Sequence, residues 1–130
     1  MIVNVVLIAE DSAYANEIGK ALVLHDFCVV YVPDPVMGWH LAREIHPGLI
    51  LIDLQLPDVG EHLLALQLCK FQGGTRIPVI GLATGCGPAV NYRAAASGCD
   101  GVINPGVDSE RFAQELTQIM ARIATSAQGG

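Results

Sequence analysis

Three acidic side chains in this sequence stand where two apolar runs end. Glu10 and Asp11 follow the run Ile2–Ala9, and Asp53 closes the run Leu49–Asp53. In a parallel sheet with these runs as neighbouring strands, the carboxyl ends meet at one edge and the three carboxylates converge there. Two like charges about 4 Å apart repel by roughly 4 kcal/mol at an effective dielectric of about 20. Such a cluster must therefore bind a cation, hold a proton or remain hydrated.

The chemistry that suits these acids is metal binding and phosphoryl transfer. Carboxylate oxygens, with water completing the shell, are the ligands that Mg²⁺ prefers. An aspartate beside such a cation can attack phosphorus, because the cation neutralises charge on the nucleophile and the phosphoryl group. The alternative is structural: Glu10 and Asp11 form a solvated helix start, and Asp53 begins a turn before Pro57. Three acids at adjacent strand ends favour the functional interpretation, since neutral turn residues would avoid the cost of clustered charge.

The elements that must position these acids are strands that alternate with helices. Five short apolar runs containing β-branched residues are typical of strands in a parallel sheet: Ile2–Ala9, Phe27–Val32, Leu49–Asp53, Pro78–Leu82 and Gly101–Asn104. Five such units predict an α/β fold, a three-layer doubly wound sandwich. Its helices lie on both faces of the sheet because right-handed crossovers place them there.

Helical patterns lie between the apolar runs. Asp11 or Ser12 can cap the first helix, and Pro35 opens the second, which ends at His46-Pro47-Gly48. Three more helices are predicted over Glu61–Phe71, over Pro88–Ser97 and, after a cap at Asp108, to Ile123. We expect one domain over residues 1–125 and a frayed tail over 126–130.

Length and composition exclude several classes of protein. A chain of 130 residues is long enough for one core and too short for two domains, and 52% hydrophobic with 15% charged residues is unlike a disordered segment. No apolar run reaches the roughly 18 residues that cross a bilayer, and the first residues lack signal-peptide features, so we expect a cytoplasmic protein. A net charge of −6 with scattered bases argues against nucleic-acid binding.

The four cysteines do not form a metal or redox motif. Cys28, Cys69, Cys86 and Cys99 lie far apart, without the short spacing of zinc sites or redox dithiols. We expect them to be buried small hydrophobic residues in a reducing cytosol.

Several stretches of the chain, from about Val3 to Ile123, follow one another in the order of a known family. They are AEDS at Ala9–Ser12, PGLILIDLQLP at Pro47–Pro57, IPVIGLAT at Ile77–Thr84, AAASG at Ala94–Gly98 and GCDGVINP at Gly98–Pro105. Together they resemble the receiver domains of response regulators in bacterial two-component systems. AEDS resembles the family's acidic pair, and PGLILIDLQLP resembles its phosphoacceptor strand and the following loop.

The resemblance implies a fold, a cofactor and partners. The fold is flavodoxin-like, with strand order 2-1-3-4-5. Glu10 and Asp11 would coordinate Mg²⁺ together with Asp53, the phosphoacceptor, and the backbone carbonyl of Gln55 would complete the metal site. The partners would be a histidine kinase or phosphotransfer protein and a downstream protein target, for a monomer or weak homodimer.

The chain departs from the family's pattern at the positions that respond to phosphorylation. Ala83 occupies the position of the switch hydroxyl; Thr84 stands next to it, but side-chain alternation along a strand points its hydroxyl elsewhere unless the strand slips by one residue. Asn104 replaces the lysine that pairs with the phosphoryl group; an amide can donate a hydrogen bond but carries no charge. The aromatic switch residue is also missing, since it would fall near Gly101 or Val102.

These features predict a stand-alone, atypical receiver-like signalling module for protein–protein interaction in a phosphorelay. It keeps the acidic pocket but responds weakly to phosphorylation, or not at all. The alternative is a working phosphoacceptor that uses Thr84 and an altered loop. A dedicated enzyme is not expected: an aspartate-nucleophile phosphatase needs a second acid where Gln55 stands. A nucleotide-binding module at Gly85-Cys86-Gly87 is disfavoured because the full glycine fingerprint is missing.

Overall fold

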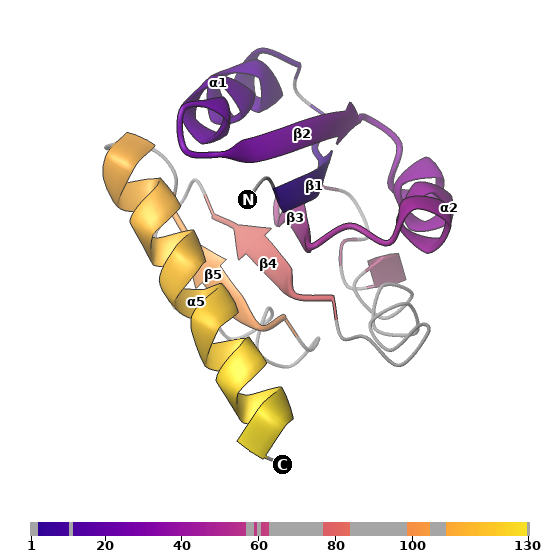
Figure 1. Ribbon diagram of the computed structural model, residues 1–130. Helices are drawn as coiled ribbons and strands as arrows, with labels where there is room; N and C mark the ends of the chain where they lie inside the picture. Colours follow the sequence, from indigo (N-terminus) through magenta and orange to yellow (C-terminus); the bar gives the residue numbers. More distant parts are fainter. Residues whose placement is uncertain are drawn as a thin grey trace.

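The structure is a computed structural model that describes residues 3–10, 12–56, 59, 61–62, 77–83, 99–104 and 109–129. Its elements run in the order β1 (Val3–Ile8), α1 (Ser12–Val23), β2 (Phe27–Val32), α2 (Pro35–Ile45), β3 (Leu49–Asp53), β4 (Val79–Leu82), β5 (Gly101–Ile103) and α5 (Ser109–Gly129) (Figure 1).

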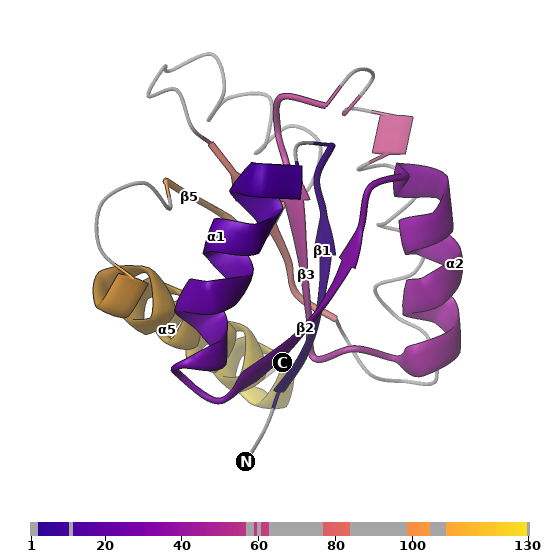
Figure 2. The same cartoon turned by 90° about the horizontal axis from the view of Figure 1, so that it is seen from above.

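The strands form one parallel five-stranded sheet in the order β2-β1-β3-β4-β5. Helices α1 and α5 pack on one face, and α2 packs on the other (Figures 1 and 2). This arrangement confirms the predicted α/β fold and its strand order. Strand β2 forms one edge of the sheet and β5 forms the other.

All five predicted strands are present, and β2 and β3 have the predicted ends. Helix α5 continues to Gly129, past residue 125, where we expected the domain to end. The predicted helix over Pro88–Ser97 lies outside the described residues, as do the cap at Asp108 and most of the predicted helix Glu61–Phe71.

Helix α2 shows why the sequence starts and stops a helix where it does. The Asp34 side chain accepts the Val36 N–H at 3.0 Å, which caps the amino end, and Pro35 occupies the first turn, where no N–H is needed. His46 closes the helix in the left-handed conformation, with φ of 48°, and donates its N–H to the Ala42 carbonyl. The predicted boundaries of this helix are therefore confirmed.

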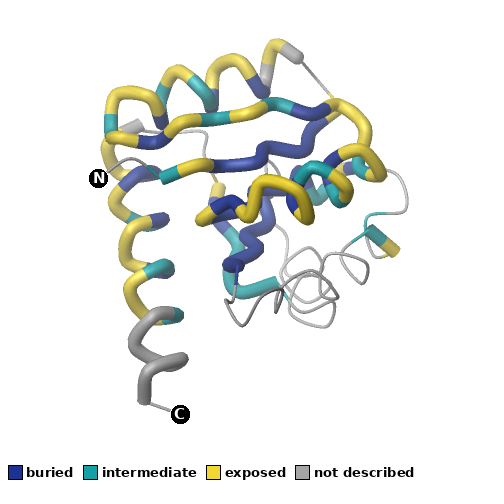
Figure 3. Tube along the Cα trace, turned by 45° about the vertical axis from the view of Figure 1, so that its right-hand side comes forward, coloured by how far each residue is buried: buried dark blue, intermediate teal, exposed yellow. Residues whose placement is uncertain are grey.

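The core consists of one cluster on each face of the sheet, with the central strands buried between them (Figure 3). Leu7, Leu51 and Ile80 pack under α1 and α5, together with Leu116. On the opposite face, Ile8, Ile50 and Ile52 pack with Ala42 of α2, among others.

Gly38 allows α2 to approach the sheet closely. A Cβ at this position would lie 2.6 Å from the Ile8 Cδ1 atom. Gly38 therefore packs directly against Ile8 of β1.

The position of β2 at the edge of the sheet contradicts one prediction, the burial of the cysteines. Cys28, which we expected to be buried, is exposed on β2, and Cys99 is half-buried; Cys69 and Cys86 lie outside the described residues. The prediction failed for Cys28 because an apolar strand at the sheet edge has a face that no helix covers.

In the described part of the chain, no helix combines the length and the apolar character that a membrane span requires.

Candidate functional site

Strand register places four of the predicted site residues at one edge of the sheet. Ile8, Ile52, Gly81 and Val102 are aligned across β1, β3, β4 and β5. Asp53 stands one residue beyond this level, at the carboxyl end of β3. Glu10, Ala83 and Asn104 each stand two residues beyond it on their own strands. The four positions therefore share the carboxyl edge, where doubly wound sheets place their functional groups.

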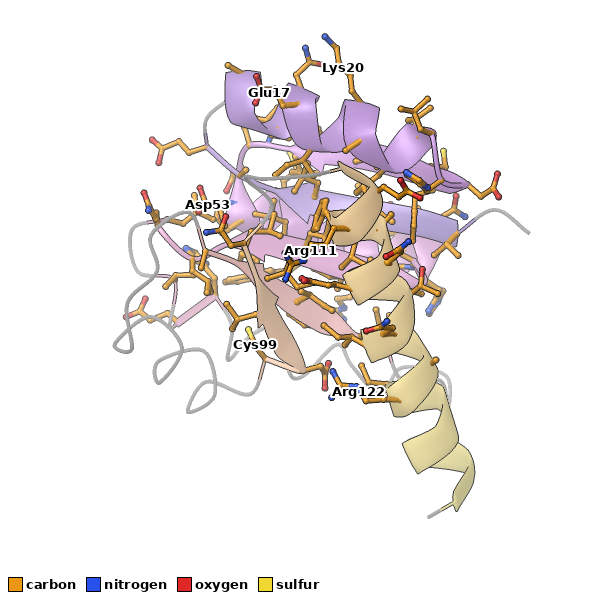
Figure 4. The ribbon with its side chains drawn as sticks, turned by 90° about the vertical axis from the view of Figure 1, so that its left-hand side faces the viewer. Glu17, Lys20, Asp53, Cys99, Arg111 and Arg122 are labelled. Carbon is orange, nitrogen blue, oxygen red and sulfur yellow. The ribbon has the colours of Figure 1, made fainter. Side chains whose placement is uncertain are left out.

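Asp53 is the buried acid at this edge, with 9% of its surface exposed (Figure 4). Its Oδ1 atom accepts the Gln55 N–H at 3.0 Å, and its backbone carbonyl accepts the Leu56 N–H at 3.3 Å. The first bond forms an Asx turn and the second closes a backbone turn after β3. The carboxylate is thus oriented by the backbone of the loop that follows it.

Glu10 lies at the end of β1, the strand next to β3, and its side chain is exposed. Its backbone is held from the other side, because the Tyr31 hydroxyl donates to the Glu10 carbonyl oxygen at 3.3 Å. The bond ties the start of the acidic loop to edge strand β2. Sequence reasoning did not assign this role to Tyr31, and no local motif marks it.

Ala83 and Asn104 occupy the corresponding ends of β4 and β5. Ala83 is buried, and its N–H donates to the Ile103 carbonyl at 3.0 Å; Asn104 follows directly and is exposed. The end of β4 therefore presents a methyl group and the end of β5 a neutral amide. Neither side chain carries a positive charge.

Close packing fixes the level of β4 against the Asp53 turn. The Leu54 N–H donates to the Leu82 carbonyl at 3.0 Å. The Leu54 side chain lies over Gly81, where a Cβ would be 2.8 Å from its methyl carbons. A glycine at this point lets the residue after the acceptor aspartate pack on the neighbouring strand.

Asp100 anchors the opposite end of the same strand pair. Its Oδ2 atom accepts the Val79 N–H at 2.8 Å, and its own N–H donates to the Val79 carbonyl at 2.8 Å. This aspartate joins β5 to the beginning of β4. The sequence pattern gave no signal for that structural role.

Two of the predicted site residues, Asp11 and Thr84, lie outside the described residues. The remaining predicted metal ligands are Glu10, Asp53 and the Gln55 carbonyl. Within the part of the chain that is described, no three His, Cys, Asp or Glu side chains group closely enough to hold a metal. The donor set nevertheless fits Mg²⁺ in kind, since carboxylate and carbonyl oxygens on neighbouring elements are its preferred ligands.

The fold is shared with solved receiver domains. Chemotaxis protein CheY4 of Vibrio cholerae superposes with a TM-score of 0.77 at 16% identity, covering 92% of this chain and 99% of that one. The CheY-like receiver domain protein of Methanospirillum hungatei gives a TM-score of 0.78 at 16% identity, covering 97% and 99%. These likenesses show that the chain has the receiver-domain fold, as the resemblance of its motifs implied.

Sequence similarity points to a particular group of relatives. The chain is 33% identical over 76 residues to the polar-differentiation response regulator DivK of Brucella ovis, a match that covers 58% of this chain and 62% of that protein. DivK of Brucella suis matches equally. No protein-family model matches the chain. The chain therefore has the receiver-domain fold, and over 76 residues its sequence is similar to DivK, of whose length it spans 62%.

Proposed function

We propose that this chain is a receiver-like signalling module whose Asp53 accepts a phosphoryl group, while its binding to a protein target depends little on that modification. One observation carries the proposal. At the shared carboxyl edge, acidic residues end β1 and β3, whereas Ala83 and Asn104 end β4 and β5. The edge thus holds groups suited to receiving phosphate without a hydroxyl or cation at the two positions suited to detecting it.

Phosphoryl transfer to Asp53 requires a carboxylate that is held in place and whose negative charge is balanced. An Asp53 carboxylate oxygen attacks phosphorus, and the bond between phosphorus and the donor's nitrogen or oxygen breaks, which leaves an acyl phosphate on Asp53. The Asx turn to Gln55 orients that carboxylate. Glu10, Asp11, Asp53 and the Gln55 carbonyl are the proposed Mg²⁺ ligands, and the cation would neutralise charge on the nucleophile and the phosphoryl group.

A conformational response to phosphorylation requires contacts with the phosphoryl group that differ between two conformations of the domain. A modification shifts a conformational equilibrium only by its difference in contact energy between the conformations. The Ala83 methyl group cannot donate a hydrogen bond to a phosphoryl oxygen, and the Asn104 amide offers a neutral bond in place of a charge-assisted one. Gly101 and Val102 supply no aromatic ring that could change its packing. We therefore infer a small conformational response.

The proposed partners follow from the class and from the charge. A histidine kinase or phosphotransfer protein would supply the phosphoryl group, and a protein would be the downstream target. A net charge of −6 disfavours nucleic acid as that target.

Two measurements on the same sample test the proposal. The protein is treated with acetyl phosphate and Mg²⁺, and intact mass spectrometry counts phosphoryl groups. Hydrogen–deuterium exchange then compares treated and untreated protein. We expect one phosphoryl group on the wild type and unchanged exchange in β5 and α5. The double variant Ala83→Thr, Asn104→Lys restores a hydroxyl and a cation, so its β5 and α5 exchange should change on treatment.

Asp53→Asn is the matched control, since it keeps the shape of the side chain and removes the nucleophile. A wild type that stays unmodified at saturating donor would overturn phosphoacceptance. A wild type whose β5 and α5 exchange changes strongly would overturn the weak response. In that case Thr84→Ala would tell whether Thr84 supplies the hydroxyl, as the alternative hypothesis requires.

A further inference from the structure

Strand β2 presents an unpaired edge of unusual composition. It is the outermost strand next to β1, and its sequence FCVVYV contains neither a charged residue nor a proline. Natural edge strands usually carry such residues, because an uncharged strand edge is a template for pairing with another strand. Cys28 and Val30 are exposed on this strand. Within its six residues, β2 therefore lacks the charges and prolines that usually protect an edge strand.

The backbone register shows which groups face outward. The Val3 N–H donates to the Asp26 carbonyl at 3.1 Å, and the Ala9 N–H donates to the Val32 carbonyl at 3.3 Å. Hydrogen bonds between parallel strands recur every second residue, so the even-numbered residues of β2 direct their backbone groups towards β1. The N–H and C=O groups of Phe27, Val29 and Tyr31 consequently point away from the sheet.

A mostly apolar groove, which Asn16 and Lys20 also line, lies beside this edge. The cavity between α1 and β2 has a volume of about 890 Å³, and its lining includes Ala15, Gly19, Val23, Val29 and Tyr31. At the end of α1, Val23 and Leu24 are exposed over 63% and 77% of their surface. Figure 2 shows β2 lying between α1 on one side and α2 on the other, with its length open to view.

We propose that β2 pairs with β2 of a second copy of this chain, antiparallel and about a two-fold axis through Val29. Antiparallel pairing needs outward-facing groups opposite outward-facing groups. With Val29 opposite the partner's Val29, Phe27 lies opposite the partner's Tyr31, and all three outward-facing residues of each strand exchange hydrogen bonds. A shift of the register by two residues would leave one of them without a partner on the opposite strand.

Side-chain chemistry favours a second copy as the occupant. In this register no two like charges lie opposite each other, because β2 carries none. Cys28 faces the partner's Val30 on one side of the joined sheet. On the other side, Phe27 faces the partner's Tyr31, an aromatic pair of the kind that stabilises antiparallel strands.

Helix α1 adds charge complementarity to this arrangement. The two-fold axis is perpendicular to the sheet, so α1 and the partner's α1 lie on the same face and run in opposite directions. Glu17 and Lys20, both exposed on α1, are separated by one turn (Figure 4). Reversal of the partner helix brings Glu17 towards the partner's Lys20 and Lys20 towards the partner's Glu17.

A disulfide tests the register directly. In Val30→Cys, the new thiol lies opposite the partner's Cys28 in a pair of strand residues without mutual hydrogen bonds, where side chains are closest. Oxidised glutathione takes up the two electrons, and the two thiols lose their protons as the bond forms. We expect a covalent dimer on a non-reducing gel. The double variant Cys28→Ser, Val30→Cys is the matched control and should give no such dimer.

The second measurement is the oligomeric state of the protein without a crosslink. Sedimentation velocity on reduced wild type should show a monomer–dimer equilibrium, and Val29→Lys should shift it to monomer by placing two like charges on the axis. Circular dichroism verifies that each variant is folded; if Val29→Lys is not, the disulfide result decides. A wild type that is monomeric at hundreds of micromolar, or crosslinking that does not need Cys28, would overturn the proposal.

Discussion

The carboxyl edge of the sheet has two halves of different chemistry. The half formed by β1 and β3 carries Glu10 and Asp53, and its loops are held by hydrogen bonds that the Tyr31 hydroxyl and the Gln55 N–H donate. The half formed by β4 and β5 ends in Ala83 and Asn104, which bring neither a hydroxyl nor a charge. Under the proposed function, receiving a phosphoryl group and responding to it depend on different strands, so the fold can keep the groups for one without those for the other.

The largest expected effect comes from a change in the half formed by β1 and β3, which carries the proposed phosphoacceptor. Asp53→Asn should abolish phosphorylation by acetyl phosphate, because a neutral amide is not a nucleophile towards phosphorus. Intact mass spectrometry measures the loss. Asp100→Asn is the control: Asp100 is a half-buried acid whose carboxylate accepts the Val79 N–H at the amino end of β4, and an amide oxygen can accept the same bond. Equal loss in both variants would contradict the assignment of Asp53.

A second prediction concerns the contact that joins the two halves. Gly81→Val should lower the free energy of unfolding by about 1–3 kcal/mol, since its Cβ would overlap the Leu54 side chain and force repacking. Urea denaturation measures the change. Gly19→Ala is the comparison, because nothing lies within 4 Å of a Cβ there and an alanine in a helix is favoured by up to about 1 kcal/mol. An unaffected Gly81→Val would show that Leu54 moves aside at little cost.

The smallest expected effect comes from a change of Glu10, the exposed acid at the end of β1. Glu10→Gln should weaken Mg²⁺ binding several-fold without abolishing it, because one charge is lost from a site in which Asp53 remains. Titration of Mg²⁺ followed by amide chemical shifts at Leu54 and Gln55 measures the affinity. Unchanged affinity would exclude Glu10 from the metal site.

Much of the fold could be predicted because local signals and tertiary packing agree. The buried run Leu49–Asp53 is a central strand on both criteria, and Asp34-Pro35 begins a helix by its own capping chemistry. The same agreement placed Asp53 and Glu10 at one edge, since strand ends follow from strand order. The periodicity of apolar residues and the order of the elements are enough to predict these parts of the structure.

Other features could not be predicted because they depend on long-range packing. The run Phe27–Val32 is as apolar as a central strand, so the sequence does not show that Cys28 is exposed or that a groove opens beside Val29. The bond from Tyr31 to Glu10 joins residues 21 positions apart, and so does that from Val79 to Asp100. Such contacts are set by strand register, which a single sequence leaves open.

The most direct test of the central claim compares amide chemical shifts before and after complete phosphorylation of Asp53. The two halves should respond differently: shifts should change at Asp53, Leu54 and Gln55, while those at Ile103 in β5 and Phe112 in α5 stay within the scatter of an untreated sample. Shift changes at Ile103 and Phe112 as large as those beside Asp53 would contradict the account, because they would show that phosphorylation is transmitted across β4 and β5 without the missing groups.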